Sequence, residues 1–191
     1  MARDTKQRMV SAAAELLRTR GLAAMSFTEV LADSGAARGA IYHHFPGGKV
    51  ELARHAVAWT GSTVREHLAA LEADRPAAVV AAFLASVRPV VEQSAGGAGC
   101  AVAAVTGESA QLDPELMATA HAALRSWITA LEAHLVRTGA DADSAGTLAT
   151  LMITFLEGAH VLCRAAGSIA PFDQGAPGIT AAAAALLDRP R

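Results

Sequence analysis

The chain has 191 residues, a formal net charge of −2 and only two cysteines. Alanine accounts for 47 residues, so the 52% share of hydrophobic side chains reflects good helix formers more than large core residues. Larger apolar residues nevertheless recur at helical spacing, which excludes an intrinsically disordered chain, and two cysteines exclude a disulfide scaffold. We therefore expect an all-α protein with reduced thiols.

The sequence shows no secretory signal, because residues 1–20 carry seven charged side chains and no uninterrupted apolar core. The most apolar later stretch, residues 148–163, falls short of the roughly 20 apolar residues that a membrane span needs. It is also interrupted by Glu157 and His160. We expect a cytoplasmic protein without a membrane partner, and a buried helix over this stretch.

Charge is distributed unevenly along the chain. Residues 1–55 hold eight Lys or Arg and five Asp or Glu, a net charge of +3, so the remainder carries −5. This asymmetry suggests a small module that meets a polyanion, joined to a larger body that does not. A difference of this size also arises by chance in soluble proteins.

Three helices are predicted at the amino end, over residues 5–20, 27–34 and 37–44. Gly21 is placed to end the first helix. Ser26 and Glu29 have the spacing of a capping box, which starts the second. Gly35 separates the second helix from the third, and Pro46 follows the third. Two short helices around a tight glycine turn are the helix-turn-helix layout.

Six further helices are predicted, over residues 49–73, 76–92, 100–109, 113–139, 143–166 and 179–187. Pro89 should kink or weaken the second of these, and the glycine-rich run 96–99 is the clearest loop. Pro177 and Gly178 weaken the last helix, and whether it starts before or after Pro177 stays open. The total is about nine helices with no strand, arranged as an amino-terminal helix-turn-helix domain (1–48), a connecting helix (49–73) and a helical bundle (74–191).

The segment from Ser34 to Leu52, SGAARGAIYHHFPGGKVEL, resembles the helix-turn-helix signature of the TetR family of bacterial transcriptional regulators. The match includes the turn glycine, the Arg-Gly pair, the Tyr-His-His-Phe block and the following lysine. It is close over roughly the first 55 residues. The segments 99–103 and 156–159 are similar to the carboxy-terminal domain of the LmrA/YxaF-like branch of that family. Family members commonly have Ser or Thr where this chain has Ala37, so one hydroxyl is missing.

In the family that the chain resembles, the third helix enters the major groove of DNA. Arg38 is then the natural reader of a guanine, since its guanidinium can bond both O6 and N7. Gly39 and Ala40 would let the backbone approach the base edges. The remaining expected contacts are to phosphates, which position the protein. The DNA-contacting residues predicted are Thr28, Arg38, Gly39, Ala40, Tyr42, His43, His44 and Lys49.

Some of these residues have an alternative interpretation. Ile41 and Phe45 are predicted to be core residues, and His44 could equally be packed in the turn. His43 and His44 are adjacent, so they point about 100° apart on a helix, and no cysteine lies near them. We therefore expect no metal and no cofactor.

The resemblance implies that the larger domain forms a homodimer and encloses a cavity for a small molecule that changes the spacing of the two DNA-reading heads. The helix over 143–166 is apolar around much of its circumference, which also favours pairing with a second copy. Few charges lie on the apolar faces, so an uncharged, hydrophobic effector is expected. Each candidate residue could instead be ordinary core. The candidates are Trp59, His67, Phe83, Cys100, Met117, His121, Trp127, Phe155 and His160.

The function predicted is a ligand-responsive repressor that binds a palindromic operator as a homodimer and is released by a hydrophobic effector. The alternatives are a helical small-molecule-binding protein and a constitutive DNA-binding protein without an inducer. An enzyme is not expected, because no nucleophile-base arrangement or phosphate loop has recognisable spacing. Glu157 and His160 are three apart on one helix, but di-iron bundles need this pair on two helices together with further glutamates.

Overall fold

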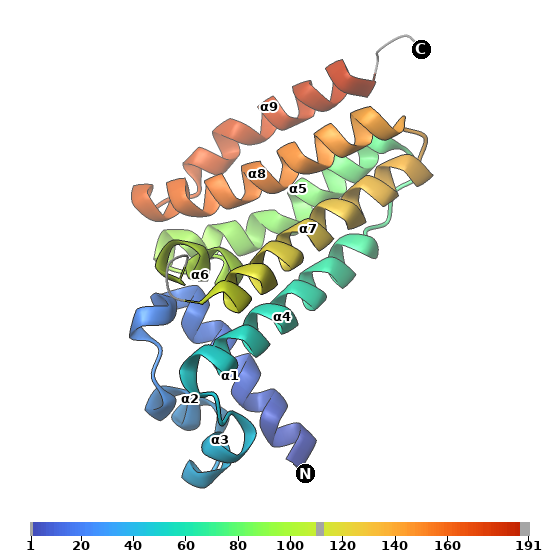
Figure 1. The fold of residues 1–191 in the computed structure, drawn as a ribbon. Helices are drawn as coiled ribbons and strands as arrows, with labels where there is room; N and C mark the ends of the chain where they lie inside the picture. The colour runs from blue at the N-terminus through green and yellow to red at the C-terminus, as the bar shows by residue number, and fades with distance from the viewer. Residues whose placement is uncertain (1, 110–112, 188–191) are drawn as a thin grey trace. The chain divides into compact units, whose positions relative to one another are not determined.

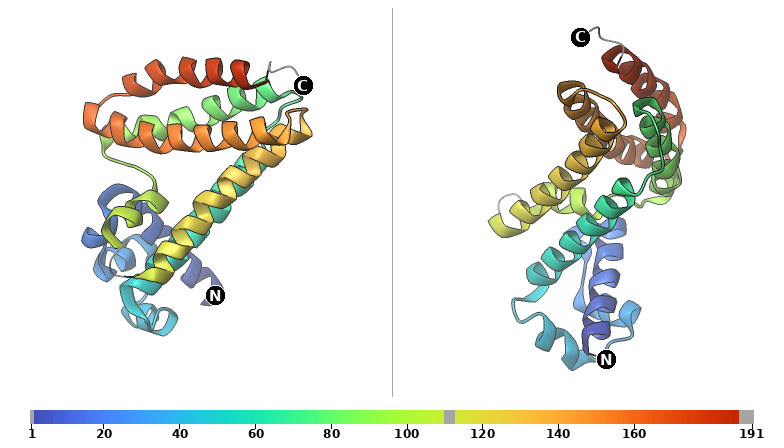
Figure 2. Two further views of the ribbon diagram at one scale, coloured as in Figure 1. Left: turned by 45° about the horizontal axis from the view of Figure 1, so that its top comes forward. Right: turned by 90° about the vertical axis from the view of Figure 1, so that its right-hand side faces the viewer.

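The computed structural model describes residues 2–109 and 113–187, which form nine α-helices and one short 3₁₀ helix (Figures 1 and 2). No strand occurs among these residues, so the all-α prediction is confirmed. By their contacts the described residues fall into two compact units. Met1–Thr63 and Cys100–Ala123 form unit 1, and Val64–Gly99 and Leu124–Arg191 form unit 2. Helices α4 and α7 each contribute to both units.

Unit 1 is built around α1. Helix α2 packs against α1, α3 contacts both, and α6 packs against α1. The elements of unit 1 are α1 (Ala2–Ala24), α2 (Phe27–Ser34), α3 (Arg38–His44), α6 (Ala101–Ser109) and the amino-terminal parts of α4 (Gly48–Ala69) and α7 (Pro114–Arg137). Its core holds large side chains that are almost fully buried, among them Leu17, Met25, Ile41, Phe45 and Leu52.

Local signals place the boundaries of the first helices. Gly21 adopts φ 79° and ψ 175°, which interrupts α1 where the sequence predicted its end. The Ser26 hydroxyl accepts the Glu29 backbone N–H at 3.3 Å and donates to the Glu29 carboxylate at 2.8 Å. Gly35 ends α2 in the left-handed conformation, at φ 62°. Ala37 caps α3 without a side-chain hydrogen bond, as expected for a residue that lacks a hydroxyl.

Unit 2 contains α5 (Pro76–Glu92), the 3₁₀ helix η1 (Gln93–Gly96), α8 (Ala142–Ala166), α9 (Ala170–Leu187) and the carboxy-terminal parts of α4 and α7. Helices α8 and α9 form an antiparallel pair, and α5 packs against both (Figures 1 and 2). Phe83 and Trp127 are buried in the core of this unit. Ser94 on η1 is hydrogen-bonded to His160 Nδ1 on α8 at 2.7 Å, and both residues are buried.

The last helix starts earlier than residue 179 and ends at Leu187, as predicted. Helix α9 begins at Ala170, so Pro177 and Gly178 lie inside it. Pro171 sits in its first turn, where no backbone donor is needed, and Pro177 forgoes a single helical hydrogen bond. Contacts of α9 with α5 and α8 stabilise the segment around that gap.

Two other regions differ from the prediction. Helix α4 ends at Ala69 rather than residue 73, and the N–H of Ala70 is shared between two carbonyls, a pattern common at helix ends. The glycine-rich run is only partly a loop, because η1 reaches Gly96. Gly97, at φ 100°, then closes the turn with its N–H bonded to the Ser94 carbonyl. Helix α5 has the predicted range, Pro76–Glu92, and continues through Pro89.

Helix α8 is longer than the apolar stretch recognised in the sequence. Its 25 residues, and the 21 residues of Pro76–Gly96, have the length and hydropathy of a membrane span. These measures do not separate a span from a core helix. Helix α8 packs against α5, η1 and α9 and has ten buried residues, including Leu148, Met152 and Ile153. This packing confirms the expectation of a buried helix.

Helices α4 and α7 lie against each other in unit 1. Arg54 forms an ion pair with Glu115. About two helical turns further along both helices, Gly61 contacts Ala123. A Cβ atom at Gly61 would lie 2.7 Å from the Cβ of Ala123, closer than real side chains approach. Gly61 is therefore required for this contact. The two helices run in the same direction here, since both contacts advance along both chains.

Candidate nucleic-acid interface

The helix-turn-helix of unit 1 consists of α2, the turn at Gly35 and α3. Ile41 and Phe45 are 0% and 1% exposed, so one side of α3 is fixed in the core, as predicted. The opposite side faces outward, and Tyr42 is 65% exposed. The Tyr42 ring contacts Phe27 of α2 edge to face, with the ring centroids 5.8 Å apart. The Tyr42 hydroxyl therefore projects from a ring whose position is held by α2.

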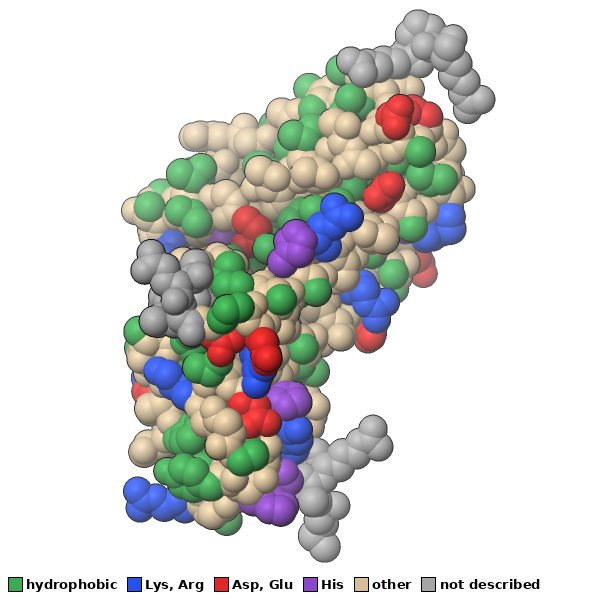
Figure 3. Space-filling model, viewed as in Figure 1, with side chains coloured by type: hydrophobic (Ala, Val, Ile, Leu, Met, Phe, Trp, Pro, Cys, Tyr) green, Lys and Arg blue, Asp and Glu red, His purple; other side chains and the backbone are tan. Residues whose placement is uncertain are grey.

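The predicted DNA-contacting residues gather on this outward side. Arg38, Gly39, Tyr42 and His43 are exposed on α3, and Thr28 is exposed in the first turn of α2. Figure 3 shows basic and histidine side chains at the end of unit 1 that carries α3. In the part of the chain that the structure describes, Arg38 has no ion pair or hydrogen-bond partner, so its guanidinium is available to a ligand.

Gly39 has open space around it. A Cβ built on Gly39 meets no atom within 4 Å, and its backbone is helical, so neither packing nor conformation requires glycine here. Ala40 beside it is partly exposed. Small residues at two successive positions leave the start of α3 with its backbone accessible.

His44 and Lys49 are less exposed than the other predicted contacts. The His44 ring lies between His43 and Phe45, with centroid distances of 5.0 and 6.4 Å, so its position agrees with the packed interpretation that was left open. The Lys49 ammonium donates to the carbonyl oxygens of Leu22 and Ala23 at 2.9 and 3.2 Å. Lys49 thus ties the start of α4 to the end of α1, a role that the sequence analysis missed.

The predicted effector residues are divided between the two units. Trp59, Cys100, Met117 and His121 belong to unit 1, while the other five belong to unit 2. Phe83 and Trp127 are core, as the alternative interpretation held, and His67 and His121 are exposed.

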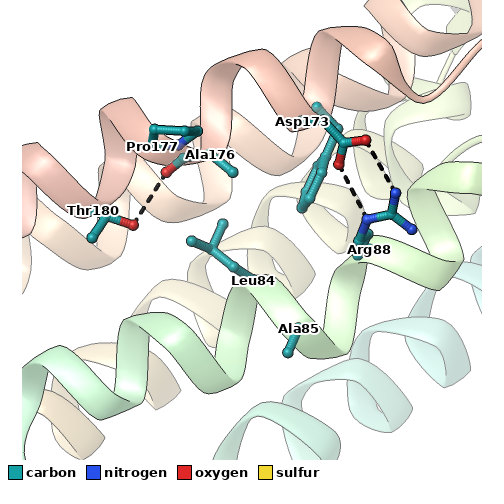
Figure 4. A pocket seen from close by; sticks show the side chains of 8 residues that line it. Leu84, Ala85, Arg88, Asp173, Ala176, Pro177 and Thr180 are labelled. Atoms are coloured by element: carbon teal, nitrogen blue, oxygen red, sulfur yellow. Dashed lines mark hydrogen bonds and ion pairs between the residues drawn. The ribbon is translucent and has the colours of Figure 1, made fainter.

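Unit 2 has an apolar groove of about 550 Å³ between α5 and α9 (Figure 4). It is lined by Leu84, Ala85, Arg88, Phe172, Asp173, Ala176, Pro177 and Thr180. None of these was a predicted effector residue. The ring of Phe155, which was predicted, packs on Phe172 with the centroids 5.2 Å apart. The sequence did not predict the groove, because it left open where α9 begins.

One bidentate ion pair sits at the edge of the groove. Arg88 Nε and Nη2 donate to the two carboxylate oxygens of Asp173 at 3.1 and 3.0 Å, as Figure 4 shows. The hydrogen bond and charge of Asp173 raise the pKa of Arg88, and Glu92 lies 3.6 Å away on the same cation. The groove therefore offers no unpaired charge to a ligand. Among the described residues, no group of three His, Cys, Asp or Glu side chains is placed to hold a metal ion.

Comparisons with known proteins agree with this geometry. Residues 9–56 match the model of bacterial regulatory proteins of the tetR family, and residues 76–176 match the carboxy-terminal domain of LmrA/YxaF-like transcriptional regulators. The HTH-type transcriptional regulator Rv0196 of Mycobacterium tuberculosis is 36% identical over 175 residues, covering 88% of each chain. The HTH-type transcriptional regulator LmrA of Bacillus subtilis is 28% identical over 170 residues, covering 88% of this chain and 90% of its own.

Solved structures show the same fold. A TetR transcriptional regulator from Chloroflexus aurantiacus superposes with a TM-score of 0.75 at 26% identity, covering 94% of both chains. The helix-turn-helix, the carboxy-terminal helical domain and the sequence relatives lead to one assignment. The chain belongs to the TetR family of bacterial transcriptional regulators, in its LmrA/YxaF-like branch.

Proposed function

We propose that this regulator is a repressor that binds a palindromic operator as a homodimer. The observation that carries the proposal is the division of α3 between two faces. Ile41 and Phe45 anchor the helix, while Arg38, Tyr42 and His43 project outward from it. An unpaired Arg at the start of a recognition helix suits bidentate bonding to guanine in the major groove.

The other exposed residues of the interface serve as positioning contacts in this proposal. Thr28, Tyr42 and His43 would bond phosphates, which set the register of the protein on DNA. Gly39 and Ala40 admit the base edges. His44 and Lys49 support the interface through their packing. A side-chain N–H group of either residue that is not bonded within the protein would also donate to a phosphate.

The homodimer is proposed to form through α8. Leu151, Val161 and Leu162 on this helix are 38%, 67% and 58% exposed. Large apolar side chains exposed along one helix favour pairing with an identical surface, and a two-fold dimer matches a palindromic site. A cytoplasmic location follows for a protein that acts on DNA in a bacterial cell.

We further infer that the groove between α5 and α9 takes an uncharged, hydrophobic effector. Its walls are mostly apolar, and its one cation is already paired with Asp173. Helix α4 starts beside the DNA-binding elements and ends in unit 2, so it is a continuous element through which such a signal would pass. A ligand that prefers the DNA-free conformation lowers operator affinity by its coupling free energy, about 1–3 kcal/mol in known systems.

Selection from a random duplex library tests the DNA-binding part. A symmetric motif of two half-sites is expected, and the purified protein should bind it with an affinity that falls steeply as salt rises, because phosphate contacts release counterions. Recovery of no symmetric motif would contradict the proposal.

The effector part needs a separate experiment, in which hydrophobic compounds are titrated into the operator complex and followed by fluorescence anisotropy. Ala176→Leu fills the groove and should abolish release, whereas Ala181→Leu on the same helix, outside the groove lining, should not. A compound that binds tightly without changing operator affinity would favour a constitutive DNA-binding protein.

A further inference from the structure

A second cavity lies within unit 1, between α1 and α4. It has a volume of about 360 Å³ and is lined by Lys6, Gln7, Val10, His55, Ala58, Trp59 and Ser62. Its lining is more polar than that of the α5–α9 groove, because polar side chains form much of its wall. It is also independent of the proposed effector site, since all its residues belong to unit 1.

Lys6 supplies a positive charge without a carboxylate partner. No Asp or Glu oxygen lies within 4 Å of its ammonium among the described residues. Its Nζ instead lies 3.3 Å from His55 Nε2 and 5.4 Å from the centroid of the Phe45 ring. Both are weak partners for an ammonium compared with an anion. The cavity thus contains a cation whose charge is not neutralised.

His55 is arranged as a neutral imidazole beside Lys6. Lysine has only donors, so its ammonium bonds the unprotonated Nε2, and the ring proton lies on Nδ1. Burial and the charges of Lys6 on α1 and Arg54 on α4 lower the pKa of His55, while Glu51 on α4 acts in the opposite direction. The Glu51 carboxylate is itself held by the Gly47 N–H at 2.7 Å. An anion beside Lys6 would favour protonation of the His55 ring, and the protonated ring would then be a second cation for the anion to bind.

Trp59 supplies an aromatic surface on the same wall. It is 36% exposed, one of the few large apolar side chains that the fold leaves accessible. It lies one helical turn beyond His55 on α4, so a planar ring against Trp59 and a charged group against Lys6 and His55 can belong to one small molecule.

We propose that this cavity binds a small aromatic carboxylate, with its carboxylate on Lys6 and His55 and its ring against Trp59. Phe45, whose ring contacts Lys6 and His55, is also the residue that ends α3. The site is therefore one side chain away from the recognition helix, in the DNA-binding unit itself.

Benzoate is the probe, and benzyl alcohol and acetate are its matched controls. The first control keeps the ring without the charge, and the second keeps the charge without the ring. Titration calorimetry on the full-length protein should show one saturable site per chain for benzoate, and at least about tenfold weaker binding of either control, the ratio expected for a charge-assisted hydrogen bond. Absence of saturable benzoate binding, or equal binding of benzyl alcohol, would overturn the proposal.

Variants locate the site. Lys6→Gln should weaken benzoate binding at least about tenfold, Lys6→Arg should retain most of it, and Arg8→Gln should change it less than about twofold. Arg8 is the matched control because it is an exposed cation on the same helix that does not line the cavity. Ala58→Phe fills the cavity while leaving Lys6 in place and should also remove binding. Equal losses in the Lys6 and Arg8 variants would mean a general charge effect and would refute the site.

Two further readouts separate this site from others. Benzoate should change the tryptophan fluorescence of the native protein but not that of Trp59→Phe, because Trp127 is buried in unit 2. Benzoate affinity should rise as pH falls from about 8 to about 6, since binding takes up a proton at His55. A flat pH profile contradicts the part assigned to His55. If Lys6→Gln weakened DNA binding while benzoate did not bind at all, Lys6 would be a phosphate contact instead.

Discussion

Replacing Gly39 by alanine should make the free protein more stable and its complex with DNA weaker. Glycine inside a helix is destabilising by about 0.5–1 kcal/mol relative to alanine, because it loses more backbone freedom on folding. At Gly39 nothing offsets this loss, since an added Cβ meets no atom within 4 Å and the backbone is helical. For a chain of this length, the midpoint of thermal unfolding should rise by about 1–4 °C.

The same methyl group points to the side of α3 that we assign to DNA. If the backbone at Gly39 approaches the base edges, the methyl group will hold α3 away from the groove and disturb the neighbouring Arg38 contact. The loss of operator affinity should then be about 1–3 kcal/mol, the range for a lost base contact.

Thermal unfolding of the free protein and fluorescence anisotropy with the selected operator measure the two effects. Gly107→Ala is a matched control, because Gly107 also lies in a helix of unit 1 with open space at its Cβ. It should be stabilised similarly and bind DNA normally. A lower stability of Gly39→Ala would show that a methyl group at this position clashes with its surroundings. An unchanged DNA affinity would remove Gly39 from the interface.

Three other outcomes are expected. Arg38→Ala should relax specificity at one base pair per half-site and weaken operator binding by about 1–3 kcal/mol, as a repeated selection from random duplexes would show; unaltered base preference would contradict its role. Lys49→Gln should lower the free energy of unfolding by about 1 kcal/mol, because two carbonyls at the end of α1 lose their donor, and urea denaturation measures this. If stability is unchanged and all DNA sequences bind more weakly, Lys49 is mainly a phosphate contact. The Ser144 N–H donates a hydrogen bond to Asp141 at the start of α8 and lowers the pKa of that carboxyl group. The stability that Asp141 contributes is therefore present above the ordinary carboxyl pKa and is lost as pH falls through the lowered pKa of the folded protein. Asp141→Asn should therefore flatten the acid limb of the stability profile, and an unchanged limb would refute this.

Short-range signals in the sequence predicted the local structure of the helix-turn-helix well. The start of α2 follows from Ser26 and Glu29, three residues apart, and the turn before α3 follows from one glycine with positive φ. The burial of Ile41 and Phe45 follows from their spacing on a short helix. Each of these features depends on residues within one or two helical turns, which a single sequence displays directly.

Features that depend on distant contacts were missed. Lys49 bonds carbonyls 26 and 27 residues away, and its lysine side chain alone suggested only a phosphate contact. The early start of α9 involves Arg88 and Asp173, 85 residues apart, and local proline and glycine content pointed the other way. The α5–α9 groove depends on that start, so it could not be anticipated either.

The contact between Gly61 and Ala123 has a mechanical consequence. It lies just before the points where α4 and α7 pass from unit 1 into unit 2, so the chain leaves unit 1 there as two helices in direct contact. A bend or rotation of one helix at this point therefore moves the other helix as well, because no side chain on Gly61 separates the two.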